Sequence, residues 1–303
     1  MSAGDVVRYA GHRWRVLVVH ATCCYIARRL RAVGLAGVGD AVGESMSQST
    51  GIEWTQATWN PWRGCTKVSP GCAHCYMFRE QKRYGRDPAV VTRSKTTFLD
   101  PLRWPTGRLI FTCSWSDWFH EAADDWRDEA WDIIRRTPRH TYQILTKRPE
   151  RIAQHLPRDW GTGYPNVWLG VSVENQRHIG RADLLARVPA VVRFLSCEPL
   201  LGPLTFRWAV WHPIGRTATT DHLDGLRHYF HWLIAGGESG PEARPCRAEW
   251  LRSLRDECRE AGVPFFLKQL GGWPDKHGAS KAVLDGACWT EMPVGYNAAE
   301  VTT

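Results

Sequence analysis

The sequence predicts an α/β protein built on a partial or complete parallel (β/α) barrel, with a small N-terminal β appendage. From residue 51 onward, short apolar runs rich in β-branched and aromatic residues alternate with amphipathic segments of helical period. Strands that alternate with helices need right-handed crossovers and pair in parallel. Six or seven such runs supply enough strands for half a barrel or a whole one.

The N-terminal segment follows a different pattern. Apolar and polar residues alternate around turns in residues 1–32, which predicts a β-hairpin or SH3-like appendage. Residues 33–50 are rich in Gly, Ala and Ser, as linkers are, and Met46 within them is a second position at which translation can begin. The main unit is then expected over residues 51–275, followed by a C-terminal tail over 276–303.

The elements of the main unit are expected in strict alternation. After an extended segment at 51–60, strands are predicted at 108–114, 141–146, 166–173, 191–197, 231–235 and 264–268, each bounded by turn residues. Asp124 and Asp125 can cap a helix whose apolar side falls between residues 126 and 134. A later helix has its apolar side between residues 250 and 261, and Gly262 and Pro264 end it.

Composition narrows the class of protein. A chain of 303 residues with 43% hydrophobic residues can bury a large core. Its ten cysteines are scattered and no signal peptide precedes them, so a reducing, cytoplasmic setting is expected. No apolar run is long enough to span a membrane. The net charge of +8, with arginine far more frequent than lysine, favours a polyanionic partner such as nucleic acid.

The most informative stretch holds Cys65, Cys72 and Cys75, separated by six and two residues. Pro70 and Gly71 bend the chain so that the first cysteine can return toward the other two. Three ligands leave one position open for an exchangeable group, whereas structural zinc sites and ordinary clusters use four. The spacing therefore predicts a metal or iron–sulfur site with an open position.

Polar residues follow each predicted strand, and in a parallel barrel these ends converge on one mouth where barrel enzymes hold their chemistry. They are Ser114, Ser116, Asp117, Lys147, Arg148, Glu174, Asn175, Glu198, Glu238, Ser239, Lys268 and Gln269. Cys113 lies near a strand end and can donate a hydrogen atom or bind metal, although plain burial is the simpler interpretation. His74 and His120 are candidates for proton transfer or cluster contact.

Several ungapped motifs occur together in the order typical of one family. They are GIEWTQATWNP (51–61), GCTKVSPGCAHCY (64–76), LTKRPER (145–151), NVWLGVSVE (166–174), EPLLGP (198–203) and GGESGP (236–241). Over about residues 51–275 the chain resembles the phage-type three-Cys-motif protein family, which is similar to radical S-adenosylmethionine (SAM) enzymes. The resemblance implies a radical-SAM-like barrel and a 4Fe–4S cluster on Cys65, Cys72 and Cys75. Its phage and DNA-modifying neighbours imply a nucleic-acid substrate.

Two features depart from the commonest radical-enzyme pattern. That pattern spaces its cysteines by three and two residues, and a Gly-Gly-Glu motif follows its second strand. Here the spacing is six and two, the second strand ends near Ser114, and Gly236-Gly237-Glu238 comes much later. The exact SAM contacts therefore do not carry over from the resemblance.

The expected activity is cleavage of cluster-bound SAM to a deoxyadenosyl radical that acts on DNA or RNA, with a flavodoxin or ferredoxin as electron donor. The assigned residues fall into three sets. The candidate catalytic residues are Cys113, His120 and Tyr76. The cofactor contacts are Ser114, Ser116, Asp117, Glu174 and Glu198, and the substrate contacts are Lys147, Arg148, Glu238 and Lys268.

Two other interpretations of the sequence remain open. The first is a nucleic-acid-binding protein in which the cysteines hold a structural zinc, with His74 or another residue as fourth ligand, or an inert cluster. The second is a hydrolase or nuclease whose metal is held by carboxylates. Its ligands would be Asp117, Glu174, Glu198 and Glu238.

Overall fold

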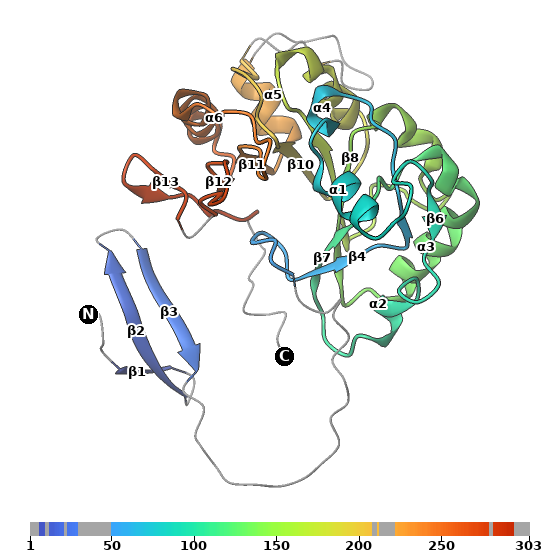
Figure 1. Cartoon of the computed structure of the whole chain (residues 1–303), viewed down its shortest axis with the longest axis horizontal. Coiled ribbons are helices and arrows are strands. Elements are labelled where there is room, and N and C mark those ends of the chain that lie inside the picture. Colours follow the sequence, from blue (N-terminus) through green and yellow to red (C-terminus); the bar gives the residue numbers. More distant parts are fainter. Residues whose placement is uncertain are drawn as a thin grey trace, which may run out of the picture.

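The computed structural model describes residues 6–9, 12–20, 23–29, 50–207, 211, 222–278 and 281–293. A seven-stranded parallel sheet forms the centre of the molecule and curls into half a barrel (Figure 1). Its strands are β4 (Ala57–Trp59), β7 (Leu109–Thr112), β8 (Thr141–Thr146), β9 (Val167–Ser172), β10 (Val192–Cys197), β11 (Trp232–Gly236) and β12 (Phe265–Gln269). The seven strands lie side by side in the order in which they occur along the chain. The described sheet ends at β4 and β12 without closing. The α/β prediction is confirmed in its partial-barrel form.

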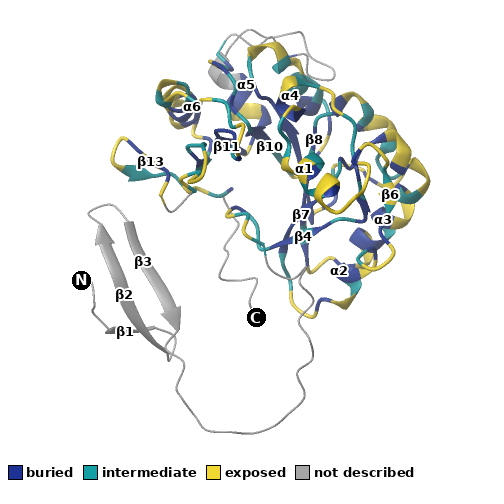
Figure 2. Ribbon diagram, in the orientation of Figure 1, coloured by how far each residue is buried: buried dark blue, intermediate teal, exposed yellow. Residues whose placement is uncertain are grey.

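Strong burial explains why these segments form strands. Every residue of β7, β9 and β11 is buried, as expected for parallel strands covered on both faces (Figure 2). One face packs on the helices. The other gathers Trp54, Phe111, Phe194 and Trp232 into an aromatic cluster of its own. Gly170 makes room for it, because a Cβ there would lie 2.3 Å from the Phe194 ring.

Helices surround the sheet, with their exposed sides toward solvent (Figure 2). They are α1 (Tyr76–Arg83), α2 (Asp100–Arg103), α3 (Asp124–Arg136), α4 (Gly180–Ala186), α5 (His222–Tyr229) and α6 (Ala248–Ala261). The two helices predicted from capping and periodicity are α3 and α6. Asp124 and Asp125 lie in the first turn of α3, and α6 ends at Gly262, whose φ of 67° is left-handed.

Short elements complete the described part of the chain. Two antiparallel pairs join β5 (Trp62–Arg63) to β6 (Thr92–Arg93) and β13 (Val283–Leu284) to β14 (Ala287–Cys288). Turns of 3₁₀ helix occur at Pro70–Cys72, Glu121–Ala123, Pro149–Arg151, Ala153–His155 and Gln176–His178. Among the residues that the structure describes, no helix is long and apolar enough to cross a bilayer.

The N-terminal strands form a separate antiparallel sheet. Its strands are β1 (Val6–Tyr9), β2 (His12–His20) and β3 (Cys23–Arg29), in the order β1-β2-β3. The sheet has one strand more than the hairpin predicted for residues 1–32. Of the linker predicted over residues 33–50, residues 33–49, including Met46, lie outside the described residues. The SH3-like character and the boundaries of the appendage and linker stay predictions.

The segment after residue 275, expected to be a tail, is in part built into the sheet. Residues 289–291 run antiparallel to the edge strand β12, with a bridge between Phe266 and Thr290. Leu267 N donates to Trp289 O at 2.7 Å, and the Trp232 indole N–H donates to Glu291 O at 2.8 Å. This segment therefore covers backbone groups that an edge strand otherwise leaves unpaired.

Candidate functional site

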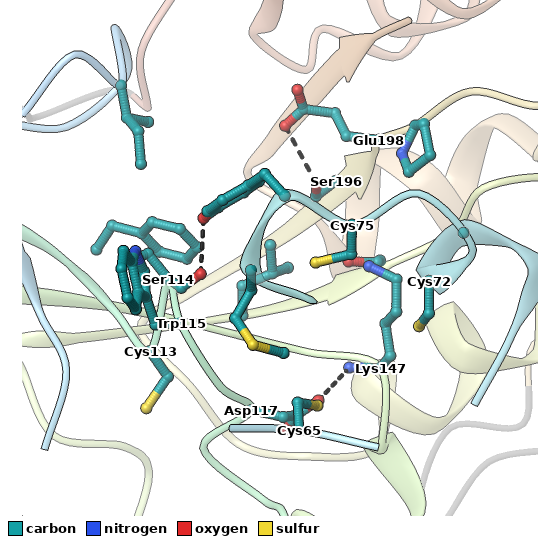
Figure 3. A pocket seen from close by; sticks show the side chains of 18 of the residues that line it. Cys65, Cys72, Cys75, Cys113, Ser114, Trp115, Asp117, Lys147, Ser196 and Glu198 are labelled. Carbon is teal, nitrogen blue, oxygen red and sulfur yellow. Dashed lines mark hydrogen bonds between the residues drawn. The ribbon is translucent and has the colours of Figure 1, made fainter. Parts of the chain in front are cut away.

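A cavity of about 440 Å³ lies at the carboxyl ends of the parallel strands. Most of the predicted site residues line it, and Figure 3 shows ten of the lining residues labelled. The predicted residues at this cavity are Cys65, Cys72, Cys75, Tyr76, Cys113, Ser114, Ser116, Asp117, Lys147, Arg148, Glu198, Glu238 and Lys268. His120 and Glu174 are not among its lining residues. The convergence follows from the topology, because parallel strands in chain order present all their carboxyl ends at one edge.

The three cysteines come from one loop and the start of one helix. Cys65 opens the loop after β5, Cys72 ends its 3₁₀ turn, and Cys75 immediately precedes α1. All three are free thiols at the cavity (Figure 3). Within the described ranges, no three His, Cys, Asp or Glu side chains gather as ligands of a single ion.

Glu174, at the end of β9, holds the middle of the cysteine loop. Its carboxylate is fully buried and accepts hydrogen bonds from the Ser69 hydroxyl and from Gly71 N, the latter at 3.3 Å. Arg181 on α4 donates to its other oxygen at 2.7 Å. Burial acts to raise the pKa of Glu174, but Lys147, Ser69 and Arg181 outweigh it and keep that pKa below the usual value. Glu174 is thus an anchor of the loop.

A second anchor follows β11. The Glu238 carboxylate accepts two hydrogen bonds from the Arg244 guanidinium, at 2.7 and 2.6 Å, and lies 3.2 Å from His74 Nδ1. Arg244 also donates to Pro70 O at 3.0 Å. His74 and Glu238 are therefore bound to each other, and through Arg244 they fix the turn between the first two cysteines.

The third anchor joins β7 to β8. Arg148 donates to Cys65 Sγ at 3.6 Å, to Thr66 Oγ1 at 2.7 Å and to Asp117 Oδ2 at 3.3 Å. Asp117 also accepts from Thr146 Oγ1 at 2.6 Å and from two backbone N–H groups, those of residues 119 and 147. Arg148 and Asp117 are both buried and already bonded within the protein.

His120 lies behind this anchor and away from the cavity. Its Nδ1 accepts from Ala122 N at 3.2 Å, so the ring proton sits on Nε2, which lies 3.1 Å from Thr66 Oγ1. Burial, followed by the charge of Arg148, lowers the pKa of His120, which favours the neutral ring. The expectation that His120 transfers protons to substrate does not fit this position, since the ring supports the cysteine loop.

The serines at the end of β7 are also bonded internally. Ser116 Oγ donates to Gly64 O at 2.5 Å, and Ser114 Oγ shares a hydrogen bond of 3.0 Å with the Asn60 side chain. The Tyr76 hydroxyl donates to Ser114 O at 2.6 Å. These contacts join the cysteine loop and α1 to the end of β7.

Three charged side chains, those of Glu198, Lys268 and Lys147, lie at the cavity. Glu198, after β10, lies 3.1 Å from the Lys268 ammonium and accepts from Ser196 Oγ at 3.3 Å. The Lys147 side chain lies near Cys72 and Cys75 in Figure 3. Its ammonium makes no hydrogen bond or ion pair with any described residue. An acid and two cations are thus available to a bound group.

The environment of Cys65, Cys75 and Cys113 raises the pKa of each of these thiols. Burial, and then the charge of Asp117, raises the pKa of Cys65 to about 12, while Arg148 acts to lower it. Burial likewise raises the pKa of Cys75, against the effect of Lys147. Cys113 is buried with a left-handed φ of 66°, and burial raises its pKa well above the usual value. An inert thiol is expected at Cys113.

Sequence reasoning missed three residues that build this site, namely Asn60, Arg181 and Arg244. They hold Ser114, Glu174 and Glu238 respectively. The sequence did indicate that such partners exist, because a carboxylate at the end of a buried strand requires a cation or a hydrogen-bond donor beside it. The sequence does not say which arginine reaches it.

Comparison with known proteins gives one family. The family described as a protein of unknown function (DUF5131) matches residues 49–293. No curated protein matches the chain, and no solved structure does.

Proposed function

The chain belongs to the DUF5131 family, whose function is unknown, and we therefore propose a function from the site itself: an iron–sulfur enzyme of the radical SAM type that acts on nucleic acid. The observation that carries this proposal is the set of three free thiols at the mouth of a parallel half-barrel. Three thiolates and an open cavity suit a 4Fe–4S cluster with one exchangeable position.

The donor set fits a cluster better than a single ion. Each thiolate of a cubane binds a different iron, so the three sulfurs need not meet at one point, as ligands of zinc must. Metal ligands bind deprotonated, so cluster binding has to displace the protons that burial favours on Cys65 and Cys75, and the charges of Arg148 and Lys147 act in the direction of the thiolate.

In this proposal the protein holds the cluster on Cys65, Cys72 and Cys75 and excludes water around it. A bound and reduced cluster would supply the electron that cleaves SAM, and a flavodoxin or ferredoxin would deliver it. The cavity volume of about 440 Å³ is in the range of cofactor sites. Glu198 can bind the ammonium of the SAM methionine, and Lys268 or Lys147 its carboxylate. Glu198 is therefore the preferred cofactor contact.

The alternative functions receive less support. A carboxylate-bound metal would need Asp117, Glu174 and Glu238 to turn away from Arg148, Arg181 and Arg244. A structural zinc would need a fourth ligand, His74 or another residue, and His74 could offer only Nε2, since its Nδ1 lies 3.2 Å from Glu238. A nucleic-acid substrate is supported by the net charge of +8.

Iron, sulfide and SAM turnover test the proposal. Protein prepared without oxygen should bind about four irons with matching sulfide per chain. It should also release 5′-deoxyadenosine from SAM when reduced by dithionite. Cys65→Ala, Cys72→Ala and Cys75→Ala should each lose the cluster, whereas the matched control Cys246→Ala, which lies outside the cavity lining, should retain it. Zinc without iron would favour the structural-metal alternative, and full clusters in all three variants would exclude this ligand set.

A further inference from the structure

A second cavity, of about 650 Å³, lies beside the cysteine loop and is not used by the proposed chemistry. It lies between the β5–β6 pair and the end of α1. Its lining is mainly basic and hydroxyl-bearing, with Arg63, Arg86, Arg93, Lys95, Thr92 and Thr96. It includes one acid, Asp87, whose Oδ1 accepts a hydrogen bond from Ala89 N at 2.9 Å. Guanidinium and hydroxyl groups are the donors that proteins direct at phosphate.

Three of its four cations lack an acidic partner among the residues that the structure describes. Arg93 is neutralised by Glu129, whose two oxygens both lie 2.7 Å from Arg93 Nη2. Arg63, Arg86 and Lys95 make no such ion pair. Burial, and next the like charge of Arg86, lowers the pKa of Arg63. Crowded cations without a partner are stabilised when an anion binds between them.

Aromatic side chains connect this cavity to the cysteine site. The Arg63 guanidinium lies over the Trp115 ring, 5.6 Å from its centre, and Trp115 lines the main cavity. The Tyr84 ring, which is 62% exposed, lies 6.5 Å from Trp115. A basic cavity followed by accessible aromatic rings is the arrangement that binds single-stranded nucleic acid, because phosphates pair with cations while bases stack.

We propose that the second cavity binds backbone phosphates of a single-stranded nucleic acid, whose next nucleotides pass over Tyr84 and Trp115 into the main cavity. The proposal rests on the proposed function for its substrate class and adds the surface that holds this substrate. An anionic membrane surface would pair with the cations, but its binding would not require aromatic rings that lead into a cavity. A phosphorylated peptide would pair with the cations without a row of bases to stack.

Salt-dependent binding of a fluorescein-labelled oligothymidylate to the full chain, prepared anaerobically, tests the site. Arg63→Ala/Arg86→Ala should weaken binding roughly tenfold or more, since each lost bond joins charged groups. The slope of log K against log salt should fall by about 1.4, from two lost phosphate contacts on a single strand. Glu129→Gln frees Arg93 and should strengthen binding, with a slope steeper by about 0.7. A variant that gains affinity cannot be a misfolded one.

The controls separate this inference from the enzyme proposal. Arg103→Ala/Arg136→Ala removes the same charge from exposed positions on α2 and α3 and should leave affinity within about twofold. Iron content and SAM cleavage should be unchanged in every variant, so a failure of the cluster chemistry would show there and not in binding. Equal affinity of Arg63→Ala/Arg86→Ala and the unaltered protein overturns the site. Binding to phosphatidylserine vesicles or to a phosphopeptide, without binding to the oligothymidylate, also overturns the site. The absence of binding to all of these probes overturns it as well.

Discussion

Arg148 and Asp117 form an ion pair at the base of the cysteine loop, and both side chains are almost fully buried, with 5% and 7% exposed. Asp117 accepts four hydrogen bonds, so its carboxylate oxygens are satisfied within the protein. Arg148 divides its donors among this carboxylate, Cys65 and Thr66. The pair therefore positions the first cysteine and leaves contact with a ligand to its neighbours.

Removing one member of this pair should be costly. Arg148→Ala leaves Asp117 as a buried carboxylate without its cation, which typically costs about 3–5 kcal/mol of unfolding free energy. We expect a large drop in the melting temperature and poor iron loading, because Cys65 also loses its donor. Arg158→Ala is the matched control, since Arg158 is exposed and forms no ion pair with a described residue, and its effect on stability should stay within about 0.5 kcal/mol. Equal melting temperatures for the two variants would contradict this role.

His140 gives the protein a defined response to acid. Its ring is buried, Nε2 lies 3.0 Å from Pro101 O, and Nδ1 has no hydrogen-bond partner among the described residues. Burial lowers the pKa of His140 from 6.5 to about 4. The unfolded chain therefore takes up this proton first as the pH falls, so stability is complete above about pH 6.5 and declines toward pH 4.

A substitution isolates this contribution. His140→Gln keeps a donor for the Pro101 carbonyl and removes the titration. Between pH 7 and pH 4 the unaltered protein should lose up to about 3 kcal/mol more unfolding free energy than the variant. Urea unfolding at a series of pH values measures the difference. Parallel pH curves for the two proteins would show that folding does not lower the pKa of His140.

At the scale of elements, the cysteine loop depends on a close approach to β9. Gly71 lies against the Glu174 carboxylate, and a Cβ there would be 2.8 Å from Oε1. Glu174 cannot easily move away, because Arg181 and Ser69 hold it. The loop and the strand end are therefore packed as one unit.

Gly71→Ala tests this packing. We expect a loss of about 1–3 kcal/mol in unfolding free energy, the usual effect of an added methyl group in a tight contact. Iron content should fall with it, because Cys72 is the next residue. Gly180→Ala is the matched control, since no atom lies within 4 Å of its added Cβ and it begins helix α4. Thermal unfolding and iron analysis of both variants decide the point, and normal loading of Gly71→Ala would argue that the loop is loose.

The same elements show how far sequence reasoning reaches. Strands such as β9 and β11 were predictable because a parallel strand buried on both faces is a continuous apolar run. The two-residue strands β5 and β6 were not, because so short a segment has no period. The positions of Asp117, Glu174 and Glu238 near the mouth followed from the strand ends. The arginine partners of these carboxylates could not be predicted. The pairing depends on the paths of loops that are distant in the sequence.

At the scale of the whole molecule, an open half-barrel has two edges, and the C-terminal segment covers one of them. Residues 289–291 pair with β12, and Trp289 packs on the core beneath Arg255 and Arg259, whose guanidinium groups lie 5.2 and 5.8 Å from its ring. Leu284, in the hairpin before it, is buried. The family match also extends to residue 293. The folded unit therefore continues past residue 275.

A pair of shortened chains tests this boundary. A chain that ends at residue 282 loses the β13–β14 hairpin, Trp289 and the strand-like segment on β12, so Trp232 and Phe266 lose their cover. Loss of the buried Leu284 side chain alone costs about 2–5 kcal/mol, and the exposed edge of β12 becomes free to pair with other chains. We expect aggregation or a much lower melting temperature. A chain that ends at residue 293 keeps all of these contacts and should unfold like the full chain. If the shorter chain stayed monomeric with an unchanged melting temperature by circular dichroism, the segment would contribute no stability to the half-barrel.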